Sequence, residues 1–99
     1  MARTVTRPEI GLNPLAQSLA DFGHLIRNRR ACSGLALMDA ADQLGVSKSA
    51  LSRLENGRAV GLDLALRVAS GLGLQLLIVD KAQAADALDA IRPAAAEAE

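Results

Sequence analysis

The sequence has one cysteine, one histidine and one aromatic residue, and it contains no long apolar run. A single cysteine, Cys32, cannot form an internal disulfide, and together with one histidine it provides too few ligands for a structural zinc ion. With Phe22 as the only aromatic side chain, single-stranded nucleobases find no aromatic platform on which to stack. These absences exclude disulfide-stapled and zinc-stapled folds and argue against binding of single-stranded nucleic acid.

Membrane and export signals are also missing from the sequence. No apolar run approaches the roughly 20 residues that cross a bilayer, and the opening residues, MARTVTRPEIG, contain no apolar core of a signal peptide. We therefore expect a cytoplasmic protein. Its 99 residues are 51% apolar and 22% charged. This balance is typical of a chain that folds as one domain.

The net charge of zero conceals an uneven distribution along the chain. Residues 24–58 carry six basic and three acidic side chains, whereas residues 80–99 carry two basic and five acidic ones. A clustered basic region binds polyanions even on a neutral chain, because charges act within a Debye length of about 8–10 Å. The middle of the chain is therefore the candidate for phosphate contacts.

Apolar spacing predicts a helical domain over residues 14–73, preceded by a flexible arm of residues 1–13. The first helix is expected over about 14–32, because four apolar residues recur there at spacings of four, three and four. Another helix is expected over about 63–72, where the glycine pair at its end supplies a stop. The apolar stripe of the first helix consists of Leu15, Leu19, Phe22 and Ile26.

Two short helices in the middle of this domain are joined by a tight turn. The first of them begins at Leu37 and ends before Gly45, and only Val46 and Ser47 separate it from the next. The hydroxyl of Ser47 suits the N-cap of the second, which ends about ten residues later at Gly57. Two helices joined so closely must cross at a steep angle, which predicts a helix-turn-helix arrangement.

The second helix of this pair carries a polar face that suits a DNA major groove. Arginine and lysine donate hydrogen bonds to guanine O6 and N7, and serine pairs with several base edges. Composition alone would favour a merely solvated face, but the tight turn favours a binding face. The residues of this face that are expected to bind DNA are Lys48, Ser49, Ser52 and Arg53, and Arg58 follows just beyond the helix.

Arg30 lies on the apolar stripe of the first helix and needs a carboxylate partner there. A buried guanidinium without a counterion costs several kcal/mol. Glu55, at the end of the helix that carries the polar face, is the best candidate in the chain. We expect Arg30 and Glu55 to form a structural ion pair, which leaves Arg27, Arg29 and Arg58 for phosphates or solvent.

Residues 74–80, LQLLIVD, differ from the helical segments. They are short, apolar on both faces and end in β-branched residues, which predicts a strand. A lone strand cannot satisfy its backbone groups, so we expect antiparallel pairing with the same strand of a second copy in a twofold homodimer. The alternative is a tail of the preceding helix or a buried loop. The expected dimerisation residues are Leu74, Leu76, Leu77, Ile78 and Val79.

The remaining residues, 81–99, form an acidic, alanine-rich tail. A weak helix is expected over 82–91, with Pro93 ending it, either docked on the dimer or available to a partner. His24 has no nucleophile at helical spacing, and no phosphate loop or catalytic carboxylate pair is found. We therefore expect no enzyme, no catalytic residue, no cofactor and no metal, with Cys32 as a small, half-buried apolar residue.

Three pieces of the stretch 26–72 together make a recognisable pattern. They are Arg30 with Gly34, the motif LGVS preceded by Ala41, and the motif LSRLENG that includes Glu55. This stretch resembles the lambda-repressor-like, Xre-type helix-turn-helix domain. The resemblance implies a DNA-binding transcriptional regulator whose third helix enters the major groove through Ser47, Lys48, Ser49, Ser52 and Arg53.

The sequence departs from the family pattern where the second helix begins. Members usually open this helix with a small polar cap followed by a glutamine that contacts a phosphate, and this chain has Ala36 and Leu37 instead. The loss removes a cap worth about 0.5–2 kcal/mol and one DNA-positioning hydrogen bond. Leu37 is then expected to face protein.

The continuation LGLQLLIV is similar to the HipB-type branch, whose C-terminal strand pairs across the dimer. Members of that branch are often antitoxins that bind a HipA-like kinase. Two functions therefore stay open: a regulator that binds a palindromic operator in double-stranded DNA as a homodimer, or an antitoxin or protein-binding module that neutralises a kinase toxin. The expected fold is all-α, with four to five helices and one C-terminal strand.

Overall fold

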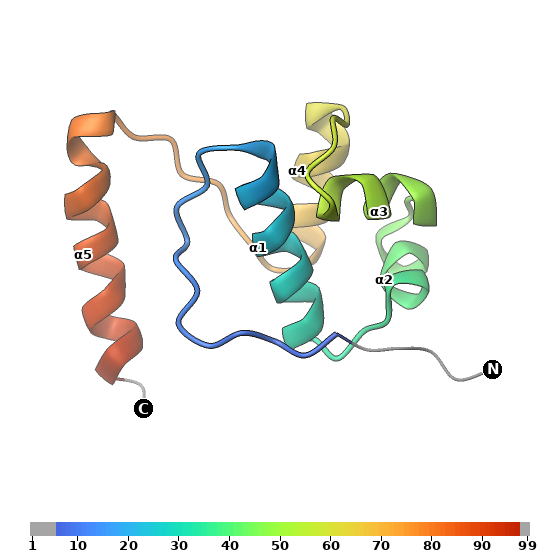
Figure 1. The fold of residues 1–99 in the computed structure, drawn as a ribbon, viewed down its shortest axis with the longest axis horizontal. Coiled ribbons are helices and arrows are strands. Elements are labelled where there is room, and N and C mark those ends of the chain that lie inside the picture. The colour runs from blue at the N-terminus through green and yellow to red at the C-terminus, as the bar shows by residue number, and fades with distance from the viewer. Residues whose placement is uncertain (1–5, 98–99) are drawn as a thin grey trace.

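The protein is all-α, as the sequence predicts (Figure 1). A computed structural model describes residues 6–97 and contains, over these residues, five helices and no strand. None of the described helices is long and apolar enough to span a bilayer. The helices are α1 (Leu19–Cys32), α2 (Leu37–Leu44), α3 (Lys48–Glu55), α4 (Leu62–Gly71) and α5 (Lys81–Glu97).

The start of α1 differs from the prediction by about five residues. Ser18 is its N-cap, and the Ser18 hydroxyl accepts a hydrogen bond from the amide of Asp21 at 3.1 Å. Before it, the Asn13 side chain accepts from the amide of Leu15 at 2.9 Å, a local bond that competes with helix formation. Leu15 therefore lies outside the helix, and Leu19 is 54% exposed, so the predicted stripe is wrong at its N-terminal end.

The core of the protein lies among the first four helices. Its largest fully buried side chains are Ile26 of α1, Leu51 of α3 and Val68 of α4. α2 contributes Ala40 and Ala41, which are small. Burial of a side chain the size of leucine stabilises a fold by roughly 1.5–3 kcal/mol, so these three residues hold α1, α3 and α4 together. Among the side chains that the structure describes, none of those in this core comes from α5.

The backbones of α1 and α3 come close together at Gly23. A methyl group at Gly23 would overlap the carbonyl oxygen of Leu54 and lie 2.9 Å from that of Glu55. Just beyond α3, Gly57 adopts a φ of +74° and lies against Ala20 of α1. Because glycine alone permits this approach, the C-terminal end of α3 rests directly on the first half of α1.

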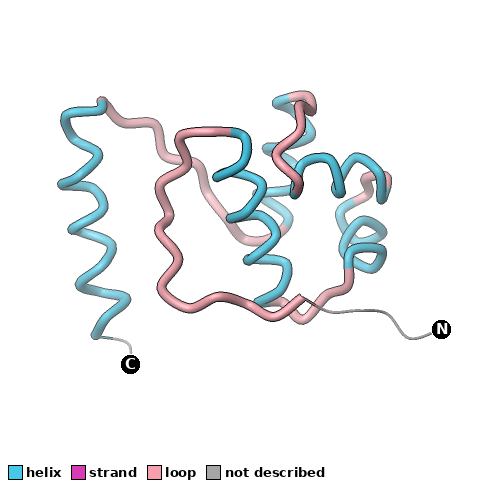
Figure 2. Tube along the Cα trace, in the orientation of Figure 1, coloured by secondary structure: helices cyan, strands magenta, loops and turns pink. Residues whose placement is uncertain are grey.

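Residues 6–18 form one of two long non-helical segments and lie beside α1 (Figure 2). The amide of Glu9 donates to the Asn28 side chain at 2.6 Å, and the Asn28 amide group donates to the Glu9 carbonyl at 3.4 Å. The Glu9 carboxylate is also 2.5 Å from the His24 ring. The flexibility expected of residues 1–13 stays a prediction, and residues 1–5 lie outside the described part.

The second non-helical segment is residues 74–80, where a strand is predicted and none is seen (Figure 2). A strand is defined by hydrogen bonds to a neighbour, and the described part of this chain supplies no second strand. The amides of residues 75–79 make no backbone hydrogen bond within residues 6–97. The segment is therefore an extended connection from α4 to α5 in the single chain.

α5 stands apart from the other helices at one end of the molecule (Figure 1). It starts at Lys81 and ends at Glu97, so the prediction that Pro93 ends the helix is wrong. Proline removes one hydrogen-bond donor, but the sequence on both sides of Pro93 is rich in alanine. Alanine has the highest helix propensity of all residue types.

Candidate nucleic-acid interface

The turn between α2 and α3 is fixed by hydrogen bonds at both of its ends. The amide of Val46 donates to the Ala41 carbonyl at 3.1 Å and that of Gly45 to the Asp42 carbonyl at 3.3 Å. With Gly45 in the left-handed region, this is the Schellman motif that ends α2. The Ser47 hydroxyl then accepts from the amide of Ala50 at 3.1 Å and caps α3.

One side of α3 is buried and the other faces solvent. Leu51 and Leu54 lie in the core, whereas Lys48, Ser49 and Arg53 are exposed. No element within the described part of the chain covers this polar face. The predicted DNA-binding side chains of α3 are therefore accessible along the length of the helix, with Ser52 half-buried at the margin.

Three of the predicted site residues also make contacts within the protein. The Ser47 hydroxyl, besides capping α3, lies 3.4 Å from that of Ser49. Arg53 Nη2 donates to the carbonyl oxygen of Ala59 at 3.0 Å. Arg53 thus braces the loop between α3 and α4, in which Arg58 is exposed.

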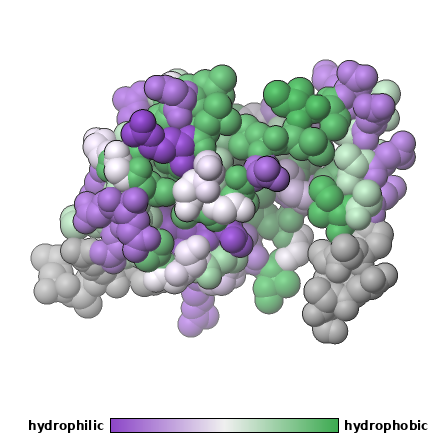
Figure 3. All heavy atoms as spheres, turned by 180° about the vertical axis from the view of Figure 1, so that it is seen from behind, coloured by the Kyte–Doolittle hydropathy of each residue, from purple (hydrophilic) through white to green (hydrophobic). Residues whose placement is uncertain are grey.

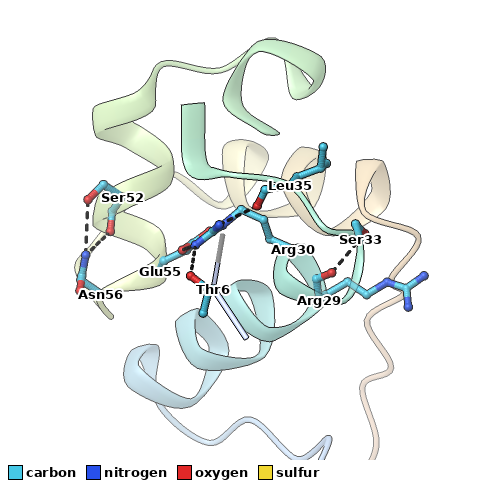
Figure 4. A network of polar contacts seen from close by, with 8 residues as sticks. All are labelled: Thr6, Arg29, Arg30, Ser33, Leu35, Ser52, Glu55 and Asn56. Carbon is cyan, nitrogen blue, oxygen red and sulfur yellow. Dashed lines mark hydrogen bonds and ion pairs between the residues drawn. The ribbon is translucent and has the colours of Figure 1, made fainter. Parts of the chain in front are cut away.

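Asn56 also belongs to this surface, although it is not among the residues predicted from the sequence to bind DNA. It is the C-cap residue of α3, and its Nδ2 donates to the Ser52 carbonyl at 2.8 Å and lies 3.4 Å from the Ser52 hydroxyl (Figure 4). The signal in the sequence is the position of an asparagine directly before Gly57, where polar residues commonly satisfy the end of a helix. Asn56 orients the Ser52 hydroxyl at the edge of the exposed face.

A buried ion pair joins α1 to α3 behind this face, between the two residues that the sequence pairs. Arg30 Nε is 2.6 Å from Glu55 Oε2, Arg30 Nη2 is 2.8 Å from Glu55 Oε1, and both side chains are 5% exposed. Arg30 Nη1 also donates to the Leu35 carbonyl at 2.8 Å, and Nη2 donates to the Thr6 hydroxyl at 3.3 Å (Figure 4). This bidentate pair positions α3 and is not available to DNA.

Arg29, which the sequence leaves for phosphates or solvent, has a partner inside the protein. Its Nε donates to the carbonyl oxygen of Leu72 at 2.8 Å. Leu72 is the C-cap of α4, where the carbonyl groups lack helical partners and favour a cation. The prediction is therefore corrected for Arg29, while Arg27 and Arg58 are exposed.

Two further side chains differ in how well the sequence predicts their surroundings. The Cys32 side chain is exposed rather than half-buried, because it lies at the end of α1 on the side away from the core. Leu37 is half-buried against the core, as expected for a residue that faces protein. The N-cap of α2, Ala36, makes no capping hydrogen bond through its side chain.

One comparison with known proteins identifies the fold around this face. The sequence model of a family described as a helix-turn-helix domain matches residues 21–77, which is more than half of the chain. No curated protein matches the chain. The match includes α2, the turn and α3, and domains of this kind are typical of DNA-binding proteins rather than enzymes. The chain therefore belongs to the family of Xre-like helix-turn-helix domains.

Proposed function

We propose that the protein is a sequence-specific transcriptional regulator, acting as a repressor, that inserts α3 into the major groove of double-stranded DNA. The observation that carries this proposal is the polar face of α3, which is left exposed while the opposite face is buried in the core. The helix-turn-helix domain supports DNA as the partner. The Arg30–Glu55 pair and the capped turn hold α3 rigidly, so little order has to be gained on binding.

Each polar residue of the face has its own role in this proposal. Lys48 and Arg53 read guanine edges, and a good bidentate contact discriminates between bases by about 1–3 kcal/mol. Arg53 exchanges its bond to the Ala59 carbonyl for the base contact. Ser49 and Ser52 pair with neighbouring base edges, while Ser47 at the N-terminus of α3 and Arg58 in the following loop contact phosphates.

The regulator acts as a homodimer on a palindromic operator, with the two copies of α3 in major grooves about 34 Å apart. Residues 75–79 support this because they are extended and mostly apolar, and their amides have no backbone partner in the described chain. They border an apolar groove of about 730 Å³ between α1 and α5. Figure 3 shows hydrophobic residues gathered on the surface next to α5. Antiparallel pairing of this segment with its copy in a second molecule would cover the segment and the groove.

A gel-shift experiment tests the proposal. A labelled duplex from upstream of the gene should shift at sub-micromolar protein and lose affinity steeply with added salt. The double variant Lys48→Ala with Arg53→Ala should not shift it. A control that also removes two positive charges, Arg67→Ala on α4 with Lys81→Ala on α5, should bind nearly as well. Equal binding by both double variants would remove α3 from the mechanism.

A second candidate function is an antitoxin or protein-binding module that holds a HipA-like kinase through the acidic tail. The observation that favours it is α5, none of whose described side chains belongs to the core. A chain that ends at residue 80 distinguishes the two functions. A regulator keeps its DNA binding without the tail, whereas an antitoxin loses its partner in a pull-down with a kinase encoded next to it.

A further inference from the structure

The described part of the N-terminal arm is anchored where Arg30 joins the segment before α2 to the C-terminal end of α3. The Thr6 hydroxyl accepts from Arg30 Nη2 at 3.3 Å. The same guanidinium bonds the carbonyl of Leu35, two residues before α2 begins, and the carboxylate of Glu55, the last residue of α3. Figure 4 shows Thr6 pointing at this guanidinium. The arm therefore passes beside the C-terminal end of α3.

A second anchor holds the arm three residues later. The backbone of Glu9 exchanges two hydrogen bonds with the Asn28 side chain, and its carboxylate pairs with His24. Arg7 lies between the two anchors and is followed by Pro8, whose ring fixes its own φ. Because consecutive Cα atoms are about 3.8 Å apart, the backbone of Arg7 cannot move far from Thr6.

The side chain of Arg7 is exposed and has no ion-pair or hydrogen-bond partner among the described residues. Its nearest carboxylate along the chain, that of Glu9, is paired with His24. Two of the other arginines near this end of α3 have internal contacts: Arg30 holds Glu55 and Arg53 holds the Ala59 carbonyl. Arg7 is thus an uncommitted positive charge beside the proposed recognition helix.

The dimensions of α3 place that charge near a DNA backbone. Eight residues of helix are about 12 Å long, and the major groove is also about 12 Å wide. With α3 in the groove, its ends lie close to the phosphates that border the groove. We propose that Arg7 contacts one of these phosphates and forms a second, sequence-independent attachment of the protein to DNA. The inference rests on the proposed function.

The salt dependence of binding tests this inference, because a phosphate contact contributes about 0.9 to the slope of log affinity against log salt. Fluorescence anisotropy would measure binding of the full chain to the upstream duplex and to a duplex of scrambled sequence. Arg7→Ala should make this slope shallower by about one on both duplexes. When the salt concentration rises from about 50 to about 200 mM, the ratio of wild-type affinity to Arg7→Ala affinity should fall roughly threefold.

Three further variants separate a phosphate contact from a structural effect. Arg7→Lys keeps the charge and should restore the slope. Lys81→Ala removes the same charge from α5, far from α3, and should leave the slope unchanged. Thr6→Val frees the arm while retaining Arg7, so it should weaken binding with the slope preserved. The thermal midpoints of Arg7→Ala, Arg7→Lys and Lys81→Ala, followed by circular dichroism, should match that of wild type, whereas Thr6→Val should melt slightly lower because Arg30 loses one acceptor.

Two outcomes overturn the inference, and they can be told apart from failure of the proposed function. If wild type binds neither duplex, the proposed function fails and this inference with it. If wild type binds but Arg7→Ala has the wild-type slope, as Lys81→Ala does, only the phosphate contact is refuted. A salt dependence in Arg7→Lys as shallow as that of Arg7→Ala would also refute the phosphate contact. The positive charge would then not be the cause of the steeper slope of wild type.

Discussion

The bundle of α1–α4 and the chain that follows Gly73 bury their apolar side chains to very different extents. Ile26 and Leu51 are 1% and 0% exposed, whereas Leu77 and Ile78 are 74% and 95% exposed. Both regions contain many apolar residues, but most of those in residues 75–79 stay exposed within the described part of the chain. Exposed apolar runs of this kind often mark interaction sites, which is why we propose that residues 74–79 pair with a second copy.

The bundle and the later segment also differ in how their polar groups are satisfied. In the bundle, every buried polar side-chain atom among the described residues has a hydrogen-bond partner. In residues 75–79 the backbone amides have no backbone partner within the described chain. Substitutions in the two regions should therefore affect different quantities: the free energy of unfolding in the first and self-association in the second.

The largest loss of stability is expected from Glu55→Ala, which leaves Arg30 charged and unpaired in the core. Removal of one partner of a buried pair lowers the free energy of unfolding by about 3–5 kcal/mol. Urea denaturation followed by circular dichroism measures this change. Asp89→Ala, which removes an exposed carboxylate from α5, should stay within about 0.5 kcal/mol of wild type. Similar losses in the two variants would contradict a special role for the ion pair.

A smaller loss is expected from Gly23→Ala, because the added methyl group meets the backbone of Leu54 and Glu55. Overpacking of this kind costs about 1–3 kcal/mol. In an exposed helix the same change would stabilise by about 1 kcal/mol, so the sign of the effect isolates the close approach. Gly61→Ala is the control, since its methyl group meets only the flexible end of the Asp63 side chain. A stabilised Gly23→Ala variant would show that α1 and α3 do not touch there.

Much of the bundle and part of its site could be predicted because their signals are local or repeat at helical spacing. Gly45 and Ser47 mark the ends of α2 and α3 through backbone preferences that need no tertiary information. Arg30 on an apolar stripe demands a carboxylate, and Glu55 at the end of α3 meets that demand. These inferences depend on the chemistry of a few residues rather than on the complete packing.

The remaining features depend on distances that the sequence does not encode directly. The bond from Arg29 to the Leu72 carbonyl joins residues 43 positions apart, and no periodicity predicts it. At the start of α1, Pro14 is a suitable first-turn residue, but the Ser18 cap determines the first residue of the helix. The strand over 74–80 needs a hydrogen-bonding partner, so one chain cannot form it however favourable its composition.

The smallest effect on folding is expected from Leu77→Asp combined with Ile78→Asp. Both side chains are already mostly exposed, so the free energy of unfolding of dilute protein should change by no more than about 0.5 kcal/mol. Self-association should nevertheless be lost, because two carboxylates would be buried where two copies meet. Sedimentation velocity over a range of concentrations measures the oligomeric state of wild type and variant.

A control for this last variant adds two carboxylates elsewhere in the same half of the chain. Gln83→Glu with Ala90→Glu places them on exposed positions of α5 and should leave the dimer intact. If the control dissociates as well, general charge repulsion rather than the 74–79 segment would explain the loss. If wild type sediments as a monomer at every concentration, a second copy does not complete this segment. Its exposed apolar residues would then lack the cover that the proposed homodimer provides, and the twofold arrangement on a palindromic operator would have to be abandoned.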